Sequence, residues 1–259
     1  MDVQVSARLF DWGARVLYIG PAFGLTPHRN AAGVLAVALD GTIGVADDPR
    51  ARAPSWRVAR SVLILPNSLH HLRIEGGRTA FLYVDPLSRD LAALRVRMRD
   101  EGPRAAFDLA DEGAAIELLT DIAARRLAAE QARGAVAKLL GVGASAKADA
   151  RIAAALARMR DDPCASHALA DLARHAKLSP SRFLHLFKEV TGVPLRRYRI
   201  WNRIGAAAAA IAQGASLTKA AHDAGFASSS HFSSAFRDMF GMMPSDLFAR
   251  MRGINATLA

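Results

Sequence analysis

The sequence predicts an α+β protein, in which a β-sandwich or small barrel with associated helices is followed by an all-α region. Three observations predict this class. Short apolar runs separated by Gly, Pro and Asp fill the chain before Pro86, as is typical of strands joined by turns. After Pro86 the apolar residues follow helical spacing instead. In the last part of the chain, a pair of phenylalanines with helical spacing occurs twice.

The predicted strands come from five short runs, several of them rich in β-branched residues. The runs are WGARVLYIG (12–20), AAGVLAVALDG (31–41), RSVLILP (60–66), LHHLRI (69–74) and RTAFLYV (78–84). Asp40-Gly41 predicts a hairpin after the second run, because both central positions of such a turn need positive φ. Residues 75–77, Glu-Gly-Gly, separate the last two runs and predict a second hairpin.

Two helices are predicted between these strands and a segment rich in Gly and Ala. One apolar helical face consists of Leu91, Leu94 and Met98. The other consists of Ile116, Leu119, Ile122 and Leu127. The second face fits equally well a cover for the strands or the seam of a dimer. The segment GAVAKLLGVGASAKA (134–148) is interpreted as a linker, which divides the chain into domains over 1–140 and 150–252.

Composition and the chain ends argue against several classes of protein. The chain has 259 residues, of which 51% are hydrophobic, so it can bury two cores. It holds no run of about 18 apolar residues, the length that crosses a bilayer. MDVQVSARLF at the N-terminus lacks the features of a secretion signal, so we expect a cytoplasmic protein with no membrane partner. The lone Cys164 excludes a disulfide framework and a Cys-rich zinc site.

Positive charge is concentrated in the last two-fifths of the chain. The whole chain has a formal net charge of +10. Residues 150–259 hold 15 Lys and Arg against 7 Asp and Glu, a net charge of +8, whereas residues 1–149 hold 19 against 17. A concentrated positive field attracts a polyanion through counterion release, and double-stranded DNA is the usual one. A basic surface that only keeps the protein in solution is the alternative.

The C-terminal region contains an internal repeat. Phe183-x3-Phe187-Lys188-x3-Gly192 recurs 49 residues later as Phe232-x3-Phe236-Arg237-x3-Gly241, and Ser179 corresponds to Ser228. Serine is a preferred helix N-cap and glycine a preferred helix stop, so each copy predicts one helix with defined ends. Phenylalanines four residues apart lie on one helical face and leave the opposite face exposed.

Each copy follows a short helix that contains alanine and a tight turn, in LADLARHAKLS (169–179) and LTKAAHDAGFAS (217–228). Ala173 and Ala221 stand where two helices would approach closely, and Gly225 suits a turn position with positive φ. These features predict two helix-turn-helix units, whose second helices present a free face to the major groove. Two ordinary helical hairpins with a Phe-rich core are the alternative.

With these motifs, residues 150–250 resemble the DNA-binding domain of the AraC/XylS family of transcription regulators. The resemblance rests on FLHLFKEVTGVPLRRY (183–198), Arg203-Ile204-x-x-Ala207 and AGFASSSHFSSAFRDMFGMMPSDL (224–247). It implies seven helices, with a long helix at about 195–213 between two units that enter successive major grooves. It also implies an activator that works with RNA polymerase. Its N-terminal domain would be a cupin-like β-barrel with helices for homodimerisation, and would bind a small effector.

The resemblance assigns the residues of each reading helix that face the groove. In the first helix they are Ser181, Arg182, Leu184 and His185. In the second they are Ser229, Ser230, His231, Ser233 and Ser234. Lys188 and Arg237, near the ends of these helices, are expected to contact phosphates. His185 and Ser234 stand where the family often has Arg, so we expect weaker base readout, above all by the second helix.

Four residues of the N-terminal domain are candidates for effector binding: His28, Arg29, His70 and Arg73. Solvent-facing strand positions are the alternative for all four. His28 with His70 or His71 matches the histidines that hold a metal in enzymatic cupins. No carboxylate accompanies them, and a metal site needs three or more converging ligands. We therefore expect no metal, no other cofactor and no catalytic residue; a cupin-type metalloenzyme with an appended DNA-binding domain is the alternative function.

Overall fold

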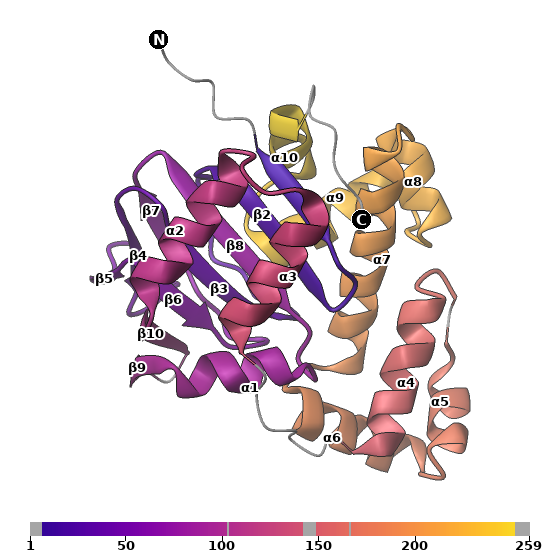
Figure 1. The fold of residues 1–259 in the computed structure, drawn as a ribbon. Helices are drawn as coiled ribbons and strands as arrows, with labels where there is room; N and C mark the ends of the chain where they lie inside the picture. Colours follow the sequence, from indigo (N-terminus) through magenta and orange to yellow (C-terminus); the bar gives the residue numbers. More distant parts are fainter. Residues whose placement is uncertain (1–6, 103, 142–148, 166, 252–259) are drawn as a thin grey trace. The chain divides into compact units, whose positions relative to one another are not determined.

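The computed structural model describes residues 7–102, 104–141, 149–165 and 167–251 (Figure 1). The chain divides into two compact parts. Residues 1–144 with 240–259 form the first part, and residues 145–239 form the second. All described strands lie in the first part, whereas the second is built from helices, which confirms the α+β class. Within the described ranges, no helix is both long enough and apolar enough to cross a membrane.

The described strands of the first part form two antiparallel sheets rather than one closed barrel. The larger sheet has the order β1-β2-β8-β3-β6-β10-β9 and the smaller the order β5-β4-β7. The bounds are β1 Arg8–Asp11, β2 Arg15–Pro21, β3 Gly33–Ala38, β4 Thr42–Ala46, β5 Trp56–Ala59, β6 Ser61–Ile64, β7 Leu72–Glu75, β8 Arg78–Val84, β9 Met98–Glu101 and β10 Ala105–Leu109. Every residue of β3 is buried, as in a central strand covered on both faces.

The two predicted hairpins are wrong, although both turns are present. β3 and β4 flank Asp40-Gly41 but lie in different sheets, and so do β7 and β8. Gly41 and Gly76 have the expected positive φ, at +92° and +123°. A Cβ on Gly41 would lie 1.9 Å from the Glu75 carbonyl oxygen, so the two turns pack directly against each other. Turn residues determine the local reversal, whereas packing decides which sheet the next strand joins.

The Asp40 carboxylate joins these two turns. Its Oδ1 accepts hydrogen bonds from the backbone N–H groups of Gly77 and Arg78, both at 2.7 Å. Its Oδ2 accepts from Nε of Arg78 at 2.9 Å. Burial raises the pKa of Asp40, but the hydrogen bonds from Arg78 and Gly77 outweigh burial and hold this pKa below its usual value.

Helices cover one face of the larger sheet. They are α1 (Arg89–Val96), α2 (Glu112–Ala123) and α3 (Ala129–Leu140), of which α2 and α3 lie across the sheet in Figure 1. Leu119 and Ile122 of α2 are buried in one core with the strand residues Leu17 and Leu35. Ile116 and Leu127 are partly buried against the same core. The predicted apolar face of the second helix therefore covers the strands.

Two predicted boundaries in this region are wrong. Helix α1 ends at Val96, so Met98, which was expected on its apolar face, is the first residue of β9. The segment interpreted as a linker begins inside α3, which continues to Leu140. A Cβ on Gly134 would meet nothing within 4 Å, so this glycine does not mark a close approach or a helix stop. Residues 142–148 of the segment lie outside the described residues.

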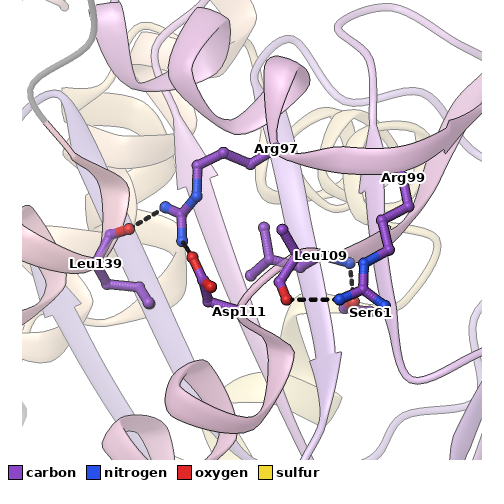
Figure 2. Close-up of polar contacts among 7 residues, drawn as sticks. Ser61, Arg97, Arg99, Leu109, Asp111 and Leu139 are labelled. Atoms are coloured by element: carbon purple, nitrogen blue, oxygen red, sulfur yellow. Dashed lines mark hydrogen bonds and ion pairs between the residues drawn. The ribbon is translucent and has the colours of Figure 1, made fainter.

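Arg97 joins the beginning of α2 to the end of α3 (Figure 2). Its guanidinium donates to the carbonyl oxygen of Leu139 and to Oδ2 of Asp111, the second at 2.8 Å. A cation beside the last carbonyl groups of a helix also interacts favourably with the helix dipole. Nearby, the buried Ser61 hydroxyl accepts from the backbone N–H of Leu109 at 2.8 Å. These contacts hold both helices and β10 in place.

The residues from Phe240 onward also belong to the first part. The N–H group and the hydroxyl of Thr26 donate to the carbonyl oxygen of Gly241, at 2.8 and 2.9 Å. The rings of Phe240 and Tyr83 meet edge to face, with centroids 5.6 Å apart. Helix α10 (Pro244–Met251) follows.

The helices of the second part include the long connecting helix expected from the sequence. They are α4 (Ala150–Asp161), α5 (Leu169–His175), α6 (Pro180–Thr191), α7 (Leu195–Ala212), α8 (Leu217–Asp223) and α9 (Ser229–Phe240). The observed bounds of α7 agree with the predicted range 195–213 to within one residue. Pro194 lies directly before α7 and has an extended backbone, so the new helix begins at the next residue. Proline is common at helix starts.

Candidate nucleic-acid interface

Two helix-turn-helix units are present in the second part, formed by α5 with α6 and by α8 with α9. Ala173 and Ala221 are 1% and 0% exposed, as expected where helices pack closely. The two turns close alike. The N–H of Leu178 donates to the carbonyl oxygen of Ala173 at 2.9 Å, and the N–H of Phe226 to that of Ala221 at 3.0 Å. Both turns therefore have the Schellman geometry that ends many helices.

One residue in each turn has a left-handed backbone. In the second unit it is Gly225, with φ of +79°, as predicted. In the first unit it is Lys177, with φ of +54°. A residue with a Cβ is strained in this region, because the Cβ comes too close to a carbonyl oxygen. The position of Lys177 was not predicted from the sequence, since a lysine does not indicate a positive φ.

The second helices of both units begin with the same cap. Oγ of Ser179 accepts from the N–H of Arg182 at 3.3 Å, and Oγ of Ser228 accepts from the N–H of His231 at 3.0 Å. Each serine thus satisfies a backbone donor that the first turn of a helix leaves without a partner. The repeat in the sequence therefore corresponds to a repeat in local structure.

The same repeat places one apolar face of each second helix in the interior. The buried phenylalanines are Phe183, Phe187, Phe232 and Phe236, none of them more than 2% exposed. Gly192 and Gly241 follow α6 and α9 with the same φ of +72°. The two second helices thus have equal lengths, equal ends and equivalent buried faces.

The opposite face of α6 carries the residues that were expected at a DNA groove. Ser181, Arg182, Leu184, His185 and Lys188 are all exposed. Among the described residues, neither Arg182 nor Lys188 has an ion-pair partner. Both cations are therefore free to approach an anion, and Leu184 adds an exposed apolar side chain to the same helix.

The opposite face of α9 consists mainly of small polar side chains. Ser230, His231, Ser234 and Arg237 are exposed, whereas Ser229 and Ser233 are half-buried. The His231 ring folds back over the turn, where its Nδ1 accepts from the N–H of Ala227 at 3.4 Å. Its centroid lies 5.4 Å from that of Phe226. This face therefore consists mainly of hydroxyl groups, beside an imidazole that already has partners.

This region matches a known family. A family model described as a helix-turn-helix domain matches residues 172–250. An AraC-like transcription regulator of Streptomyces lividans is 40% identical over 101 residues, which cover 38% of this chain. Residues 172–250 therefore match a helix-turn-helix domain of the AraC type. The chain spans 33% of the length of that curated relative.

Solved structures of ToxT from Vibrio cholerae share the fold of this chain. An apo variant of ToxT gives a TM-score of 0.61 at 14% identity, covering 92% of this chain and 98% of ToxT. A second ToxT structure gives 0.59 at 13% identity, covering 93% and 99%. At such identities the likeness concerns the fold alone.

Two arginines of α7, one helical turn apart, contact the turn of the second helix-turn-helix unit and the segment that precedes the first unit. Nη1 of Arg203 donates to the carbonyl oxygen of Gly225, in the turn of the second unit, at 3.2 Å. Arg199 donates to the carbonyl oxygen of His167, shortly before α5. Burial, with the charge of Arg203, lowers the pKa of Arg199. Neither arginine's contact was predicted from the sequence, because such contacts depend on which loops pack against α7.

Three of the four candidate effector residues lie together in the first part. His28 and His70 are buried, and the backbone N–H of each donates to the carbonyl oxygen of the other at 3.0 Å. Their Nε2 atoms are 3.0 Å apart. Nη1 of Arg29 donates to the carbonyl oxygen of Asn67 at 2.8 Å. The two histidines thus lie in the interior rather than on a solvent-facing strand.

Arg73 lies elsewhere, at an open hollow of about 410 Å³ beside β7. Its guanidinium carbon is 4.8 Å from the ring centroid of Trp56. The His71 ring meets the same indole edge to face at 5.1 Å. Phe23 and Leu25 add apolar lining. Trp56 was not predicted as a site residue, because it is brought to Arg73 only when β5 and β7 flank β4.

The geometry around the histidines does not support a metal site. Among the described residues, no three His, Cys, Asp or Glu side chains come together in a group that could hold a metal. His70 uses both ring nitrogens, with Nδ1 2.9 Å from the Ser68 carbonyl oxygen and Nε2 against His28. The metalloenzyme alternative therefore has no structural support.

Proposed function

We propose that the chain is a sequence-specific, DNA-binding transcription regulator whose two helix-turn-helix units enter successive major grooves. One observation carries the proposal. The same cap, turn and buried Phe pair occur in α6 and α9, and they leave two equivalent faces exposed to a partner. The net charge of +8 over residues 150–259 supports DNA as that partner.

The proposed contacts divide between bases and phosphates. On α6, base contacts come from Ser181, Arg182, Leu184 and His185. On α9, they come from Ser229, Ser230, His231, Ser233 and Ser234. Lys188 and Arg237, each directly after the second Phe of its pair, contact phosphates as point charges.

We further propose a division of labour along the chain. Residues 150–252 act as the DNA-binding domain, and residues 1–140 act in effector sensing and homodimerisation. RNA polymerase is the proposed protein partner, because the family resemblance implies an activator. The chain would act in the cytoplasm, with the chromosomal DNA. It would carry out no catalysis.

The effector is proposed to bind at the hollow that Arg73 lines. Solved ToxT structures include one bound to an unsaturated fatty acid and one bound to a methylnaphthalenyl butenoic acid. Both ligands combine an apolar body with a carboxylic acid. At the hollow, Phe23 and Leu25 match the apolar body, and Arg73 matches the carboxylate. His28, Arg29 and His70 would support the site by holding residues 28–30 against residues 67–70.

Enrichment of random-sequence DNA on the purified full-length chain tests the DNA-binding function. We expect one recurring sequence, bound at physiological salt at least about a thousand-fold more tightly than a scrambled duplex. The double variant Arg182→Ala/Lys188→Ala should lose most of this affinity. Arg52→Ala, which removes an exposed arginine of the first part, is the matched control. Equal affinity for every duplex would contradict the proposal.

Fluorescence titration with fatty acids and aromatic acids tests the effector site. The chain has three tryptophans, so Trp56→Phe shows whether the signal comes from the hollow. Arg73→Met should weaken acid binding, whereas Arg52→Met should not. The alcohol with the same apolar body should bind weakly to the unaltered chain. A signal that survives Trp56→Phe, with affinity unchanged in Arg73→Met, would place the site elsewhere.

A further inference from the structure

Leu184 is an apolar side chain on the exposed face of α6. It is 40% exposed, and among the described residues of the second part it is the one large hydrophobic residue classed as exposed. Its neighbours Phe183 and Leu186 are buried, with 0% and 7% of their surface exposed. The core of the domain is therefore formed without Leu184.

The place of Leu184 on the helix relates it to two groups with proposed DNA contacts. Ser181 lies three residues before it and Lys188 four residues after it, so all three share one side of α6. Ser181 belongs to the set proposed to contact bases, and Lys188 is proposed to contact a phosphate. Leu184 thus lies between a base contact and the sugar–phosphate backbone.

Leucine chemistry narrows what this position can recognise. A leucine side chain has no hydrogen-bond donor or acceptor, so it cannot read the nitrogen and oxygen atoms at base edges. The apolar group that ordinary DNA presents in the major groove is the C5 methyl of thymine. This methyl projects from the side of the base nearest its own backbone, which suits a residue beside Lys188.

We propose that Leu184 reads the C5 methyl group of one thymine in the half-site bound by α6. The inference rests on the proposed DNA-binding function and names one feature of the operator. A cytosine methylated at C5 carries the same methyl at the same place. Base recognition at this position therefore depends on a methyl group rather than on a hydrogen bond.

The test uses the full-length chain and the duplex that random-sequence enrichment selects. Each thymine is replaced in turn by deoxyuridine, which lacks only the methyl group. We expect one position at which the affinity of the unaltered chain falls about four-fold, the effect of removing one buried carbon. Leu184→Ala should bind the thymine and deoxyuridine duplexes equally at that position. Ser230→Ala, on α9, should retain the difference.

A second pair of duplexes tests whether adding the methyl group strengthens binding. At the methyl-dependent position, cytosine and 5-methylcytosine are compared opposite guanine, and the methylated duplex should bind more tightly to the unaltered chain only. Specific binding with no methyl-dependent thymine, or a methyl effect that persists in Leu184→Ala, overturns this inference and leaves the DNA-binding function standing. Absence of any sequence preference overturns both. Helix content and thermal stability of Leu184→Ala should match those of the unaltered chain, because the side chain is exposed.

Discussion

Nε2 of His28 and Nε2 of His70 lie 3.0 Å apart in the interior of the first part. Nδ1 of His28 is 2.7 Å from the Thr26 carbonyl oxygen, and Nδ1 of His70 is 2.9 Å from that of Ser68. Each of these three contacts needs one hydrogen, but two neutral imidazoles carry only two. A third proton would complete the set and would place a charge in the interior, where burial opposes it.

The free energy of unfolding should therefore fall in mild acid. Burial, with the charge that His28 would carry, lowers the pKa of His70 from 6.5 to about 3. The unfolded chain takes up a proton near pH 6.5, whereas the folded chain resists it until about pH 3. The stabilisation from keeping His70 neutral is therefore fully present above pH 7. As the pH falls from 6.5 towards 3, the free energy of unfolding decreases by about 1.4 kcal/mol per pH unit.

Urea unfolding at pH 8, 7, 6 and 5 measures this effect. A Trp201→Phe background confines the fluorescence to Trp12 and Trp56, both in the first part. His70→Gln should flatten the pH dependence, and His222→Gln, which alters an exposed histidine of α8, should not. A stability that is the same at pH 5 and pH 7 would show that the pair is not held neutral.

The strained turn of the first helix-turn-helix unit predicts a stabilising substitution. Lys177 and Gly225 occupy equivalent positions, with φ of +54° and +79°. Lys177→Gly should raise the free energy of unfolding by about 1 kcal/mol, because glycine adopts a positive φ without strain. Lys177→Ala is the matched control, since it removes the charge and keeps the Cβ. Thermal unfolding that shows an equal gain for both variants would assign the effect to charge instead of the backbone.

Local patterns in the sequence were sufficient for the repeated part of the fold. The caps at Ser179 and Ser228 follow from residue preferences within one helical turn, and so do the buried Phe pairs. The sheet partners of β3 were not predictable in this way, because β3 pairs with β6 and β8 from distant stretches of the chain. Turn residues at Asp40 could not distinguish a hairpin from a corner between sheets.

The candidate sites also contain some features that the sequence predicted and others that depend on tertiary packing. The exposed face of α6 followed from the spacing of Phe183 and Phe187, since the opposite side of a helix is determined by periodicity. The folded-back ring of His231 depends on a side-chain rotamer and on the nearby Phe226. The grouping of Trp56 with Arg73 depends on which strands lie together. Neither arrangement leaves a periodic signal in the sequence.

Arg182 and Lys188 should have different effects on DNA binding. Arg182→Ala should relax base preference in one half-site, by about 1–3 kcal/mol if the guanidinium contacts one base through two hydrogen bonds. Lys188→Ala should weaken binding to all sequences alike and reduce the slope of log affinity against log salt by about 1. Binding isotherms at several salt concentrations, on the selected duplex and on single-base variants, separate the two effects. The reverse pattern would exchange the proposed roles.

The length of α7 limits how the two reading helices can reach DNA. The helix has 18 residues. At 1.5 Å per residue it spans about 27 Å. Successive major grooves on one face of straight DNA lie about 34 Å apart. Schellman turns and capped helix starts on both sides of α7 leave little slack. Simultaneous entry into two grooves therefore requires DNA bent toward the protein, at a cost of a few kcal/mol, about what smooth bending requires.

The face of α9 offers little to offset that cost, because serine hydroxyls discriminate poorly between bases and His231 is already engaged. For a single chain we expect either bent DNA with both grooves occupied or straight DNA with only α6 fully seated. Gel mobility of circularly permuted fragments measures the bend, and methylation protection shows which grooves are occupied. Replacing Ser230 and Ser234 together by alanine should change affinity less than His185→Ala, if α6 dominates recognition. Straight DNA with two equally protected major grooves would contradict this geometry. The 18-residue connecting helix is shorter than the distance between successive major grooves of straight DNA.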